Sequence, residues 1–400
     1  MGDAESREGV ISMLYSIITQ ARDAFASVFE GQADVTVQAP GRVNLIGEHT
    51  DYNAGFVFPT AIGRWVVVVA RSRVDSRVQI YSAMHEEVAE FRADDVLEAQ
   101  GNWADYPKGV VREFQKLGYS LCGFDAAIVG NVPMGAGLSS SAAVEMAVGK
   151  GIVVLNGIEI SEPDLALLGQ RAENHFVGVN CGIMDQFISA NGRAGHALFL
   201  DCRDLSFELV PLFGDDIQIV ICNSGVTRGL TDSAYNDRRS ACESGVSLLA
   251  GAMGADLRAL RDVSMEMLDV YGDALSETVL KRCRHVITEN ERTQRAVALL
   301  KKGDLSGFGQ LMVASHESLR DDYEVSGKEL DLLVEIALNI PGVLGARMTG
   351  AGFGGCTVNI VERDAVPALA DAVDERYPKT TGLTPEIYVC SAVNGAEQVG

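Results

Sequence analysis

The chain has 400 residues, of which 47% are apolar and 22% charged, and a formal net charge of −22. This length suits two or three folding units, or two halves around a shared cleft, and the composition is that of a soluble globular protein. The acidic excess repels nucleic-acid phosphates and anionic lipid headgroups, so it argues against a nucleic-acid or membrane-surface role. Solubility or a saline habitat explains the acidity without any ligand.

The cysteines, the first residues and the short apolar runs of the sequence indicate a cytoplasmic protein. Eight cysteines are scattered with no pair at the spacing of a zinc site, and a chain of this size needs no disulfide scaffold. Residues Met1 to Glu5 are acidic and lack a signal-peptide pattern. The strongest short apolar run, Trp65 to Ala70, is too short for a membrane span and predicts a buried strand.

The first predicted element is an amphipathic helix at residues 13–29, ended by Gly31. Four strand-like segments follow at residues 34–38, 56–71, 78–81 and 124–132. The last of them leads into a glycine-rich loop at 133–141. Residues 142–155 are then apolar on nearly all sides, as in a buried helix, with Glu145 and Lys150 as exceptions.

The second half of the chain has a similar mixture of elements. Residues 217–223 predict a strand, and residues 276–338 have a helical pattern with turns near Gly303 and Gly327. A last glycine-rich loop at 349–355 lies between strand-like runs at 343–347 and 357–361. The expected class is therefore α+β with mixed sheets. No linker marks a boundary, and we expect two domains, residues 1–214 and 215–400.

The loop at 133–141, Pro-Met-Gly-Ala-Gly-Leu-Ser-Ser-Ser, has the composition of a phosphate-binding loop. Glycines let the backbone approach an anion, the serines supply hydroxyl donors and a metal ligand, and the following helix adds its N-terminal amides and dipole. No Gly-Lys-Ser/Thr follows, so this is not a Walker A loop. A glycine turn with a serine helix cap accounts for the same residues.

Residues 39–53 form a second candidate segment. Glu48, His49, Asp51 and Asn53 lie within six positions, and such a set can bind several sugar hydroxyls at once. A site of this kind also rejects analogues that lack a hydroxyl. A solvated turn explains the same composition equally well, and His49 alone is more typical of a structural histidine.

Three further features carry weaker signals. The four glycines of loop 349–355 indicate a close approach of the backbone to a ligand or to the first loop. Asp185 could accept a proton from an attacking hydroxyl or could cap a helix through Phe187 and Ile188, and local sequence leaves both open. Glu173 lies on a predicted helix, where a carboxylate is more often exposed.

Taken together, these segments resemble the galactokinase branch of the GHMP family of small-molecule kinases, over nearly the whole chain. Residues 41–52 resemble its galactose signature, 135–141 its ATP loop and 348–356 its third motif. Two further similar segments are residues 181–186 and Asn223-Ser224 with 232–239.

The resemblance implies a two-domain GHMP kinase fold with the active site in the interdomain cleft, and ATP-dependent phosphorylation of galactose at its anomeric hydroxyl. It implies Asp185 as the catalytic base and Arg42 as its electrostatic partner. The sugar-binding residues would be Glu48, His49, Thr50, Asp51, Gly182 and Tyr235. The ATP-binding residues would be Ser82, Gly135, Ala136, Gly137, Leu138, Ser139, Ser140 and Ser141. Ser141 and Glu173 would bind Mg²⁺.

Two alternative functions stay open on the sequence. Related anomeric kinases for N-acetylgalactosamine, arabinose or a uronic acid share the ATP loop and the base, and differ in the shape of the sugar pocket. A non-catalytic galactose sensor of this fold is impaired in the loop corresponding to 139–143, which is whole here. Ala54 and Gly63 depart from the usual pattern and leave the exact sugar more open than the reaction. We expect sugar and ATP as partners, no nucleic acid or membrane, and a monomer or weak oligomer.

Overall fold

The computed structural model describes residues 7–226 and 231–399, and the strands in these ranges form three sheets. The largest has six strands in the order β13-β1-β3-β6-β4-β5, antiparallel throughout except for the pair β4 and β6. Their bounds are β1 (Val35–Asn44), β3 (Pro59–Ser72), β4 (Arg77–Ser82), β5 (Glu87–Arg92), β6 (Phe124–Gly130) and β13 (Glu397–Gln398). The expectation for Met1 to Glu5 lies outside the described residues.

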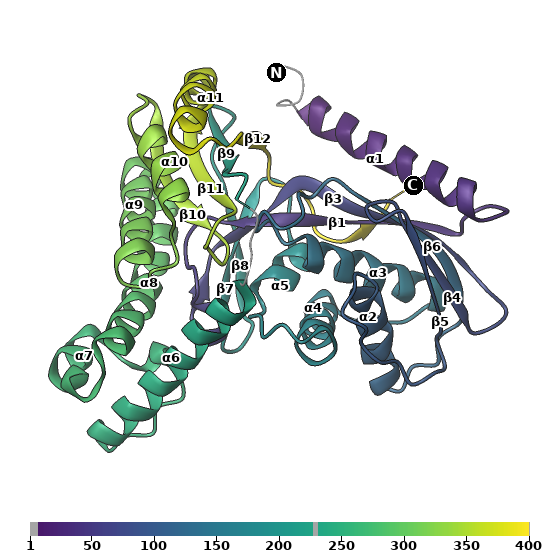
Figure 1. The fold of residues 1–400 in the computed structure, drawn as a ribbon, viewed down its shortest axis with the longest axis horizontal. Helices are drawn as coiled ribbons and strands as arrows, with labels where there is room; N and C mark the ends of the chain where they lie inside the picture. Colours follow the sequence, from purple (N-terminus) through teal and green to yellow (C-terminus); the bar gives the residue numbers. More distant parts are fainter. Residues whose placement is uncertain (1–6, 227–230, 400) are drawn as a thin grey trace.

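Helices cover both faces of this sheet (Figure 1). On one face lies α1 (Arg7–Val28), and on the other lie α2 (Asp105–Lys116), α3 (Ser140–Asn156), α4 (Glu162–Ala172) and α5 (Met184–Asn191). Val67 and Val69 of β3 join the apolar cluster of α1, whereas Val66 and Val68 join the cluster of α2 to α5. Side chains alternate between the faces of a strand, so the run Trp65 to Ala70 is apolar at every position because both faces are buried.

A four-stranded sheet in the order β10-β11-β9-β12 organises the second half of the chain. Its strands are β9 (Ile217–Asn223), β10 (Val343–Thr349), β11 (Cys356–Glu362) and β12 (Glu386–Cys390). Val220 and Cys222 pack toward α10 (Lys328–Leu338) and α11 (Val366–Thr381), while Ile219 and Ile221 face the main core. This second sheet is therefore also buried on both faces, and one face joins the two halves into a continuous core.

The remaining helices form a lobe beside this sheet, drawn in green at the left of Figure 1. They are α6 (Thr231–Met253), α7 (Met265–Tyr271), α8 (Glu277–Lys301) and α9 (Leu305–Asp321). A small sheet of β2 (Phe56–Val57), β7 (His196–Asp201) and β8 (Phe207–Pro211) lies between the halves. The short turns are η1 (Asp51–Asn53), η2 (Glu173–Val177), η3 (Leu260–Asp262), η4 (Gly272–Ala274) and η5 (Arg363–Ala365).

Most predicted elements are confirmed, including the α+β class and the breaks of the segment 276–338 at Gly303 and Gly327. The main difference is β1, which continues past Gln38 to Asn44. Pro40 and Gly41 usually break a strand, but here they lie at a register shift opposite β3. This bulge lets the strand continue through the first residues of the second candidate segment.

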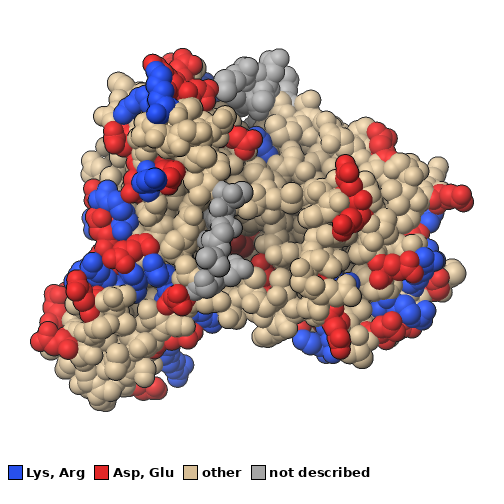
Figure 2. Space-filling view, viewed as in Figure 1, with Lys and Arg blue, Asp and Glu red and all other residues tan. Residues whose placement is uncertain are grey.

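The expected division at residue 214 lies in the loop between β8 and β9. The chain later returns to the first sheet, because β13 pairs with β1 through Val37 opposite Gln398 and Gln38 opposite Glu397. Across the ranges 7–226 and 231–399, no helix combines the length and apolarity needed to cross a bilayer. On the face shown in Figure 2, acidic and basic side chains are interspersed over both lobes.

Candidate active site

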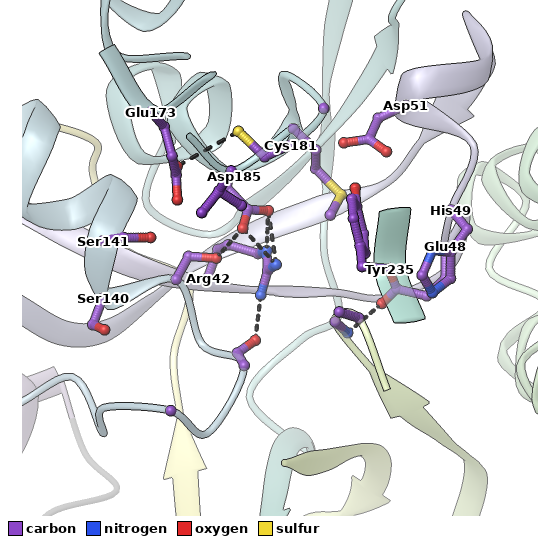
Figure 3. Close-up of a pocket in the computed structure, with 18 of the residues that line it drawn as sticks. Arg42, Glu48, His49, Asp51, Ser140, Ser141, Glu173, Cys181, Asp185 and Tyr235 are labelled. Carbon is purple, nitrogen blue, oxygen red and sulfur yellow. Dashed lines mark hydrogen bonds and ion pairs between the residues drawn. The ribbon is translucent and has the colours of Figure 1, made fainter. Parts of the chain in front are cut away.

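A pocket of about 360 Å³ is lined by residues from both halves of the sequence (Figure 3). The sequence-predicted site residues that it contains are Arg42, Glu48, His49, Asp51, Gly135, Gly137, Ser139, Ser140, Ser141, Glu173, Gly182, Asp185 and Tyr235. It is also lined by Tyr106, Val179, Cys181, Met184, Asn236, Gly350 and Ala351, which sequence reasoning did not select as site residues. The fold therefore brings three separate motifs to one cavity.

Four predicted site residues do not line this cavity: Thr50, Ser82, Ala136 and Leu138. The Thr50 hydroxyl donates to the carbonyls of Gly47 and Phe56, at 2.8 and 2.7 Å, and so holds its own turn. Ser82 is buried at the end of β4, with its hydroxyl 2.9 Å from Nδ1 of His85. Ala136 and Leu138 pack into the main core.

Asp185 occupies the centre of the pocket, between the glycine-rich loop and the second candidate segment (Figure 3). It is the second residue of α5, whose capping position is Ile183, so the helix-cap interpretation of Asp185 is wrong. Arg42 donates from Nε to Oδ1 at 2.7 Å and from Nη2 to Oδ2 at 2.8 Å. The Asp185 side chain keeps 28% of its surface exposed, against 5% for Arg42, so the carboxylate faces the pocket above a buried guanidinium.

The glycine-rich loop is tied to the same ion pair. Arg42 donates from Nη1 to the Gly137 carbonyl at 2.6 Å, and the Ser139 hydroxyl donates to Oδ2 of Asp185 at 2.5 Å. Ser139 precedes α3 in the left-handed region, at φ 61°, and makes no side-chain cap for that helix. The interpretation of this loop as a turn with a capping serine is therefore wrong, and the first amides of α3 stay available beside the pocket.

Glu173 lies on the same side of Asp185 as Ser141 of the glycine-rich loop (Figure 3). It begins the π-helical turn η2 and is 6% exposed, so the expectation of a surface carboxylate is wrong. Gln186 donates from Nε2 to Oε2 of Glu173 at 2.6 Å and to Oε2 of Glu145 at 2.9 Å. One side-chain amide therefore joins two buried carboxylates.

Among the described residues, no Lys, Arg or His forms an ion pair with either of these two buried carboxyl groups. Burial, followed by the charge of Asp185, raises the pKa of Glu173 to about 7. Burial and the charge of Glu173 raise the pKa of Glu145 well above its usual value. Glu145 is fully buried on α3, and its Oε1 has no hydrogen-bond partner. A lone acidic residue in an otherwise apolar helix was the sequence signal that could have identified it.

Glu48 and His49 form the opposite side of the pocket and are both buried, so the interpretation of this segment as a solvated turn is wrong. Oε1 of Glu48 accepts from the backbone N–H of Gly350 at 2.7 Å and from the Thr349 hydroxyl at 3.2 Å. The backbone of loop 349–355 thus approaches the second candidate segment, residues 39–53. Burial, then the charge of His285, holds the pKa of His49 well below its usual value, so the ring is neutral.

Asp51 and Gly182 meet across this side of the pocket. A side chain at Gly182 would place its first carbon 1.8 Å from Oδ2 of Asp51, so only glycine allows this contact. Burial and the neighbouring Asp185 raise the pKa of Asp51 to about 6. The Tyr235 ring, on α6, lies with its centroid 5.7 Å from that of His49. Of the segment 232–239, the side chains of Asp232 and Ser233 lie outside the described residues.

Within the described residues no group of three or more histidine, cysteine, aspartate or glutamate side chains is arranged to hold a metal ion. Ser141 and Glu173 would supply one hydroxyl and one carboxylate group, a small set that suits a cation that also binds a ligand. The geometry combines a glycine-rich loop at a helix N-terminus, a central carboxylate held by arginine, and buried hydrogen-bonding groups. Such a set can activate a hydroxyl beside a bound phosphate.

Comparison with protein families gives three matches. The chain matches the family models described as GHMP kinases N terminal domain at residues 105–193, galactokinase galactose-binding signature at 23–72, and GHMP kinases C terminal at 296–379. A galactokinase of Roseiflexus sp. (strain RS-1) is 47% identical over 381 residues, 95% of this chain and 97% of the relative. A galactokinase of Chloroflexus aurantiacus is 48% identical over 377 residues, 94% of this chain and 96% of the relative.

Solved structures have the same architecture. Lactococcus lactis galactokinase in complex with galactose superimposes with a TM-score of 0.92 and 40% identity, over 96% of this chain and all of that chain. A mevalonate kinase superimposes with a TM-score of 0.65 and 16% identity, over 90% of this chain and all of that chain. The second likeness concerns the fold alone.

Proposed function

This chain belongs to the galactokinase family of GHMP kinases, and from that premise we propose how its pocket carries out the reaction. The activity is ATP-dependent phosphorylation of galactose: the γ-phosphoryl group of ATP passes to the anomeric hydroxyl, giving galactose 1-phosphate and ADP. The observation that carries the mechanism is Asp185, held by Arg42 between the glycine-rich loop and the sugar-signature segment in one pocket.

The phosphate side of the pocket binds ATP. The backbone of loop 133–141 and the first amides of α3 face the phosphate oxygens, and the helix dipole favours their negative charge. Ser140 and Ser141 line the same wall and offer hydroxyl donors. Catalysis of phosphoryl transfer depends mostly on such positioning and on charge neutralisation.

The residues on this side also fit a magnesium ion. Ser141 and Glu173 would hold it, because Mg²⁺ takes one or two protein oxygens together with substrate phosphates and water. The buried carboxyl groups of Glu145 and Glu173 share one amide, and Oε1 of Glu145 has no hydrogen-bond partner among the described residues, so a cation at this side would compensate their charge. When bound, Mg²⁺ neutralises charge on the β- and γ-phosphates.

The sugar side holds the acceptor. Glu48 and Asp51 accept hydrogen bonds from sugar hydroxyls, and the neutral His49 ring can donate or accept one. Tyr235 covers the sugar ring. Glu48 keeps its place through Thr349 and Gly350, so its carboxylate is oriented before the sugar arrives. Because several buried acceptors would be left without partners, sugars lacking the matching hydroxyls are rejected.

Asp185 is the base. It takes the proton of the anomeric hydroxyl as that oxygen forms its bond to the γ-phosphorus, and the bond from the γ-phosphorus to the bridging oxygen breaks to release ADP. Arg42 compensates the charge of the carboxylate and, through Gly137, fixes the distance between base and phosphate loop. Its guanidinium also stabilises negative charge that develops near the transferred group.

The domain division and the setting of the enzyme complete the proposal. The first domain, residues 1–214, carries the phosphate loop and the sugar signature, and the second, 215–400, supplies the third glycine-rich loop. All eight cysteines lie within the described residues, and no disulfide joins any of them, as suits a reducing cytoplasm. A monomer or weak oligomer that binds sugar and ATP, and neither nucleic acid nor membrane, accords with the net charge of −22.

The direct test measures ADP release with Mg-ATP and a panel of sugars: galactose, N-acetylgalactosamine, arabinose, glucose and galacturonic acid. We expect galactose to give the highest kcat/KM. A higher value for one of the modified sugars would assign the chain to a related anomeric kinase. Galactose binding without ADP release from any sugar would indicate a sensor and would contradict the proposed base.

A further inference from the structure

A fully buried carboxylate on α8, outside the pocket, holds the backbone of the sugar-signature segment. Oε1 of Glu289 accepts from the N–H groups of Gly47 at 2.9 Å and Glu48 at 3.3 Å. We propose that Glu289 is a positioning residue that sets the conformation of residues 47–51 for galactose and thereby controls sugar affinity without touching the sugar. This inference rests on the proposed function.

The segment needs such support because its backbone is in an unfavourable conformation. Gly47 has φ 97° and His49, a residue with a side chain, has φ 62°. A non-glycine residue in the left-handed region costs free energy and persists only where its surroundings impose it. Glu289 binds the two N–H groups directly before His49, at the point where the chain turns into this conformation.

Other contacts from α8 converge on the same segment. His285 lies with Nε2 3.1 Å from the Glu48 carbonyl, and because a carbonyl only accepts, the ring nitrogen is the donor. Oδ1 of Asn290 accepts from the N–H of Phe56 at 2.9 Å. The contacts fall at both ends of the turn. Glu289 accepts from two consecutive N–H groups, so it fixes the orientation of the peptide between them.

The charge of Glu289 is compensated inside the protein. Oε2 accepts from Nε of Arg292 at 2.7 Å, and the Ser315 hydroxyl donates to Oε1 at 2.6 Å. Burial alone would raise the pKa of this carboxyl, but Arg292, His285 and Arg347 lower it to about 2. An ionised acceptor forms stronger hydrogen bonds than a neutral one, so Glu289 binds the N–H groups of Gly47 and Glu48 strongly.

The alternative is that Glu289 only stabilises the contact between α8, α9 and β1. If Glu289 had only this structural role, its substitution would lower the unfolding temperature and change the KM values for galactose and ATP alike. A positioning role changes the KM for galactose selectively, because the ATP-binding loop 133–141 is held by Arg42 and Asp185 and not by α8. The ratio of the two KM values therefore separates the two roles.

The experiment compares Glu289→Leu and Glu289→Gln in the full-length enzyme, with KM for galactose and for ATP measured separately. We expect Glu289→Leu to raise the galactose KM about 10-fold or more, as for the loss of a charge-assisted hydrogen bond, with the ATP KM within about 2-fold of wild type. Glu289→Gln keeps an oxygen for the two N–H groups and should recover most of the loss. Equal changes in both KM values, or no change in either, would overturn the proposal.

A matched control and a milder variant keep the test decisive. Val286→Ala removes a fully buried side chain from the same helix, in the apolar cluster of the helical lobe, and should lower stability without changing the KM ratio. If Glu289→Leu does not fold, Ser315→Ala removes one donor to the same oxygen and should raise only the galactose KM, about 2- to 5-fold; an unchanged ratio in that variant contradicts the proposal. A wild-type enzyme inactive on galactose would instead refute the proposed function.

Discussion

The two sides of the pocket differ in how their buried carboxylates are compensated. On the sugar side, Glu289 is paired with Arg292, and Glu48 lies 3.5 Å from Nη2 of Arg347. On the phosphate side, Glu145 and Glu173 share the amide of Gln186, and their pKa values are raised. Two carboxylates on the sugar side, Glu48 and Glu289, are thus paired with arginine, whereas Glu145 and Glu173 share only an amide; Asp51 is the sugar-side exception, because its pKa is also raised.

This difference matches the chemistry of the two substrates. A neutral sugar brings no charge, so the protein itself supplies the cation beside an acceptor such as Glu48. A metal-bound nucleotide brings a cation, which can supply the positive charge that the phosphate side lacks. The predictions below separate the two sides, starting with the residue between them.

The largest effect is expected for Asp185, which belongs to both sides. Asp185→Ala removes the proton acceptor and should lower kcat by at least about 10³-fold, because general-base catalysis contributes up to about 10⁴-fold. Nucleotide affinity, measured by calorimetry, should stay within a few-fold. Asp185→Asn, which preserves shape, should be equally inactive, and near-normal turnover in either variant would remove Asp185 from the mechanism.

On the sugar side, Gly182→Ala should displace the carboxylate of Asp51, because the added carbon would lie 1.8 Å from its Oδ2. Losing a charge-assisted hydrogen bond to the sugar should raise the galactose KM about 10- to 100-fold, with little change for ATP. Gly151→Ala is the control, since its added carbon meets neighbours no closer than 3.7 Å. A comparable rise in the ATP KM would show that the pocket as a whole has shifted.

On the phosphate side, Gln186→Leu should raise the Mg²⁺ concentration for half-maximal activity about 10-fold, because partners of metal ligands typically change metal affinity by that amount. Mn²⁺ binding in the presence of ATP, followed by electron paramagnetic resonance, gives a readout independent of turnover. The galactose KM should not change. Asn191→Ala on the same helix, whose amide donates to the Phe187 carbonyl, is the control.

The smallest effect concerns pH on the sugar side. Because the pKa of Asp51 is raised to about 6, this carboxyl becomes protonated below that pH and stops accepting from the sugar. The galactose KM should rise about 2-fold at about pH 6, where half of the carboxyl is protonated, and Asp51→Asn should remove that dependence. A flat pH profile in the wild type would contradict the assignment.

The raised pKa of Asp51 also makes the free energy of unfolding depend on pH. The direction is opposite to that caused by a salt-bridged aspartate, whose pKa is lowered. The folded-state pKa is above the ordinary value, so the contribution of Asp51 to the free energy of unfolding is full below pH 3.8 and is lost as pH rises through about 6. Thermal unfolding of Asp51→Asn should therefore depend less on pH between 4 and 6 than that of the wild type.

The sequence predicted residues that line the pocket better than residues that support them from outside it. Arg42 and Asp185 could be selected because they lie in recognisable motifs, and the structure places them within hydrogen-bond distance. Glu289 could not be selected, because it contacts Gly47 across 242 positions of sequence and no local pattern reports such a pairing. Glu145 was visible only as an acidic interruption of an apolar helix.

The fold was predictable where periodicity and turn residues agree, as in the segment 276–338. It was not predictable where tertiary pairing overrides a local preference, as at Pro40 and Gly41, which continue β1 because β3 lies beside them. The positions of Thr50 and Ser82 away from the cavity also depend on side-chain direction, which a sequence motif does not specify.

The pairing of β13 with β1 affects how the protein can be made. Gln38 donates to the Gly395 carbonyl at 3.1 Å, and the N–H of Val399 donates to the Thr36 carbonyl at 2.9 Å, so residues near the end of the chain cover the edge of the strand that carries Arg42. During synthesis on the ribosome this edge stays uncovered until residues 395–399 emerge. A nascent chain in that interval exposes a strand edge that can pair with other chains.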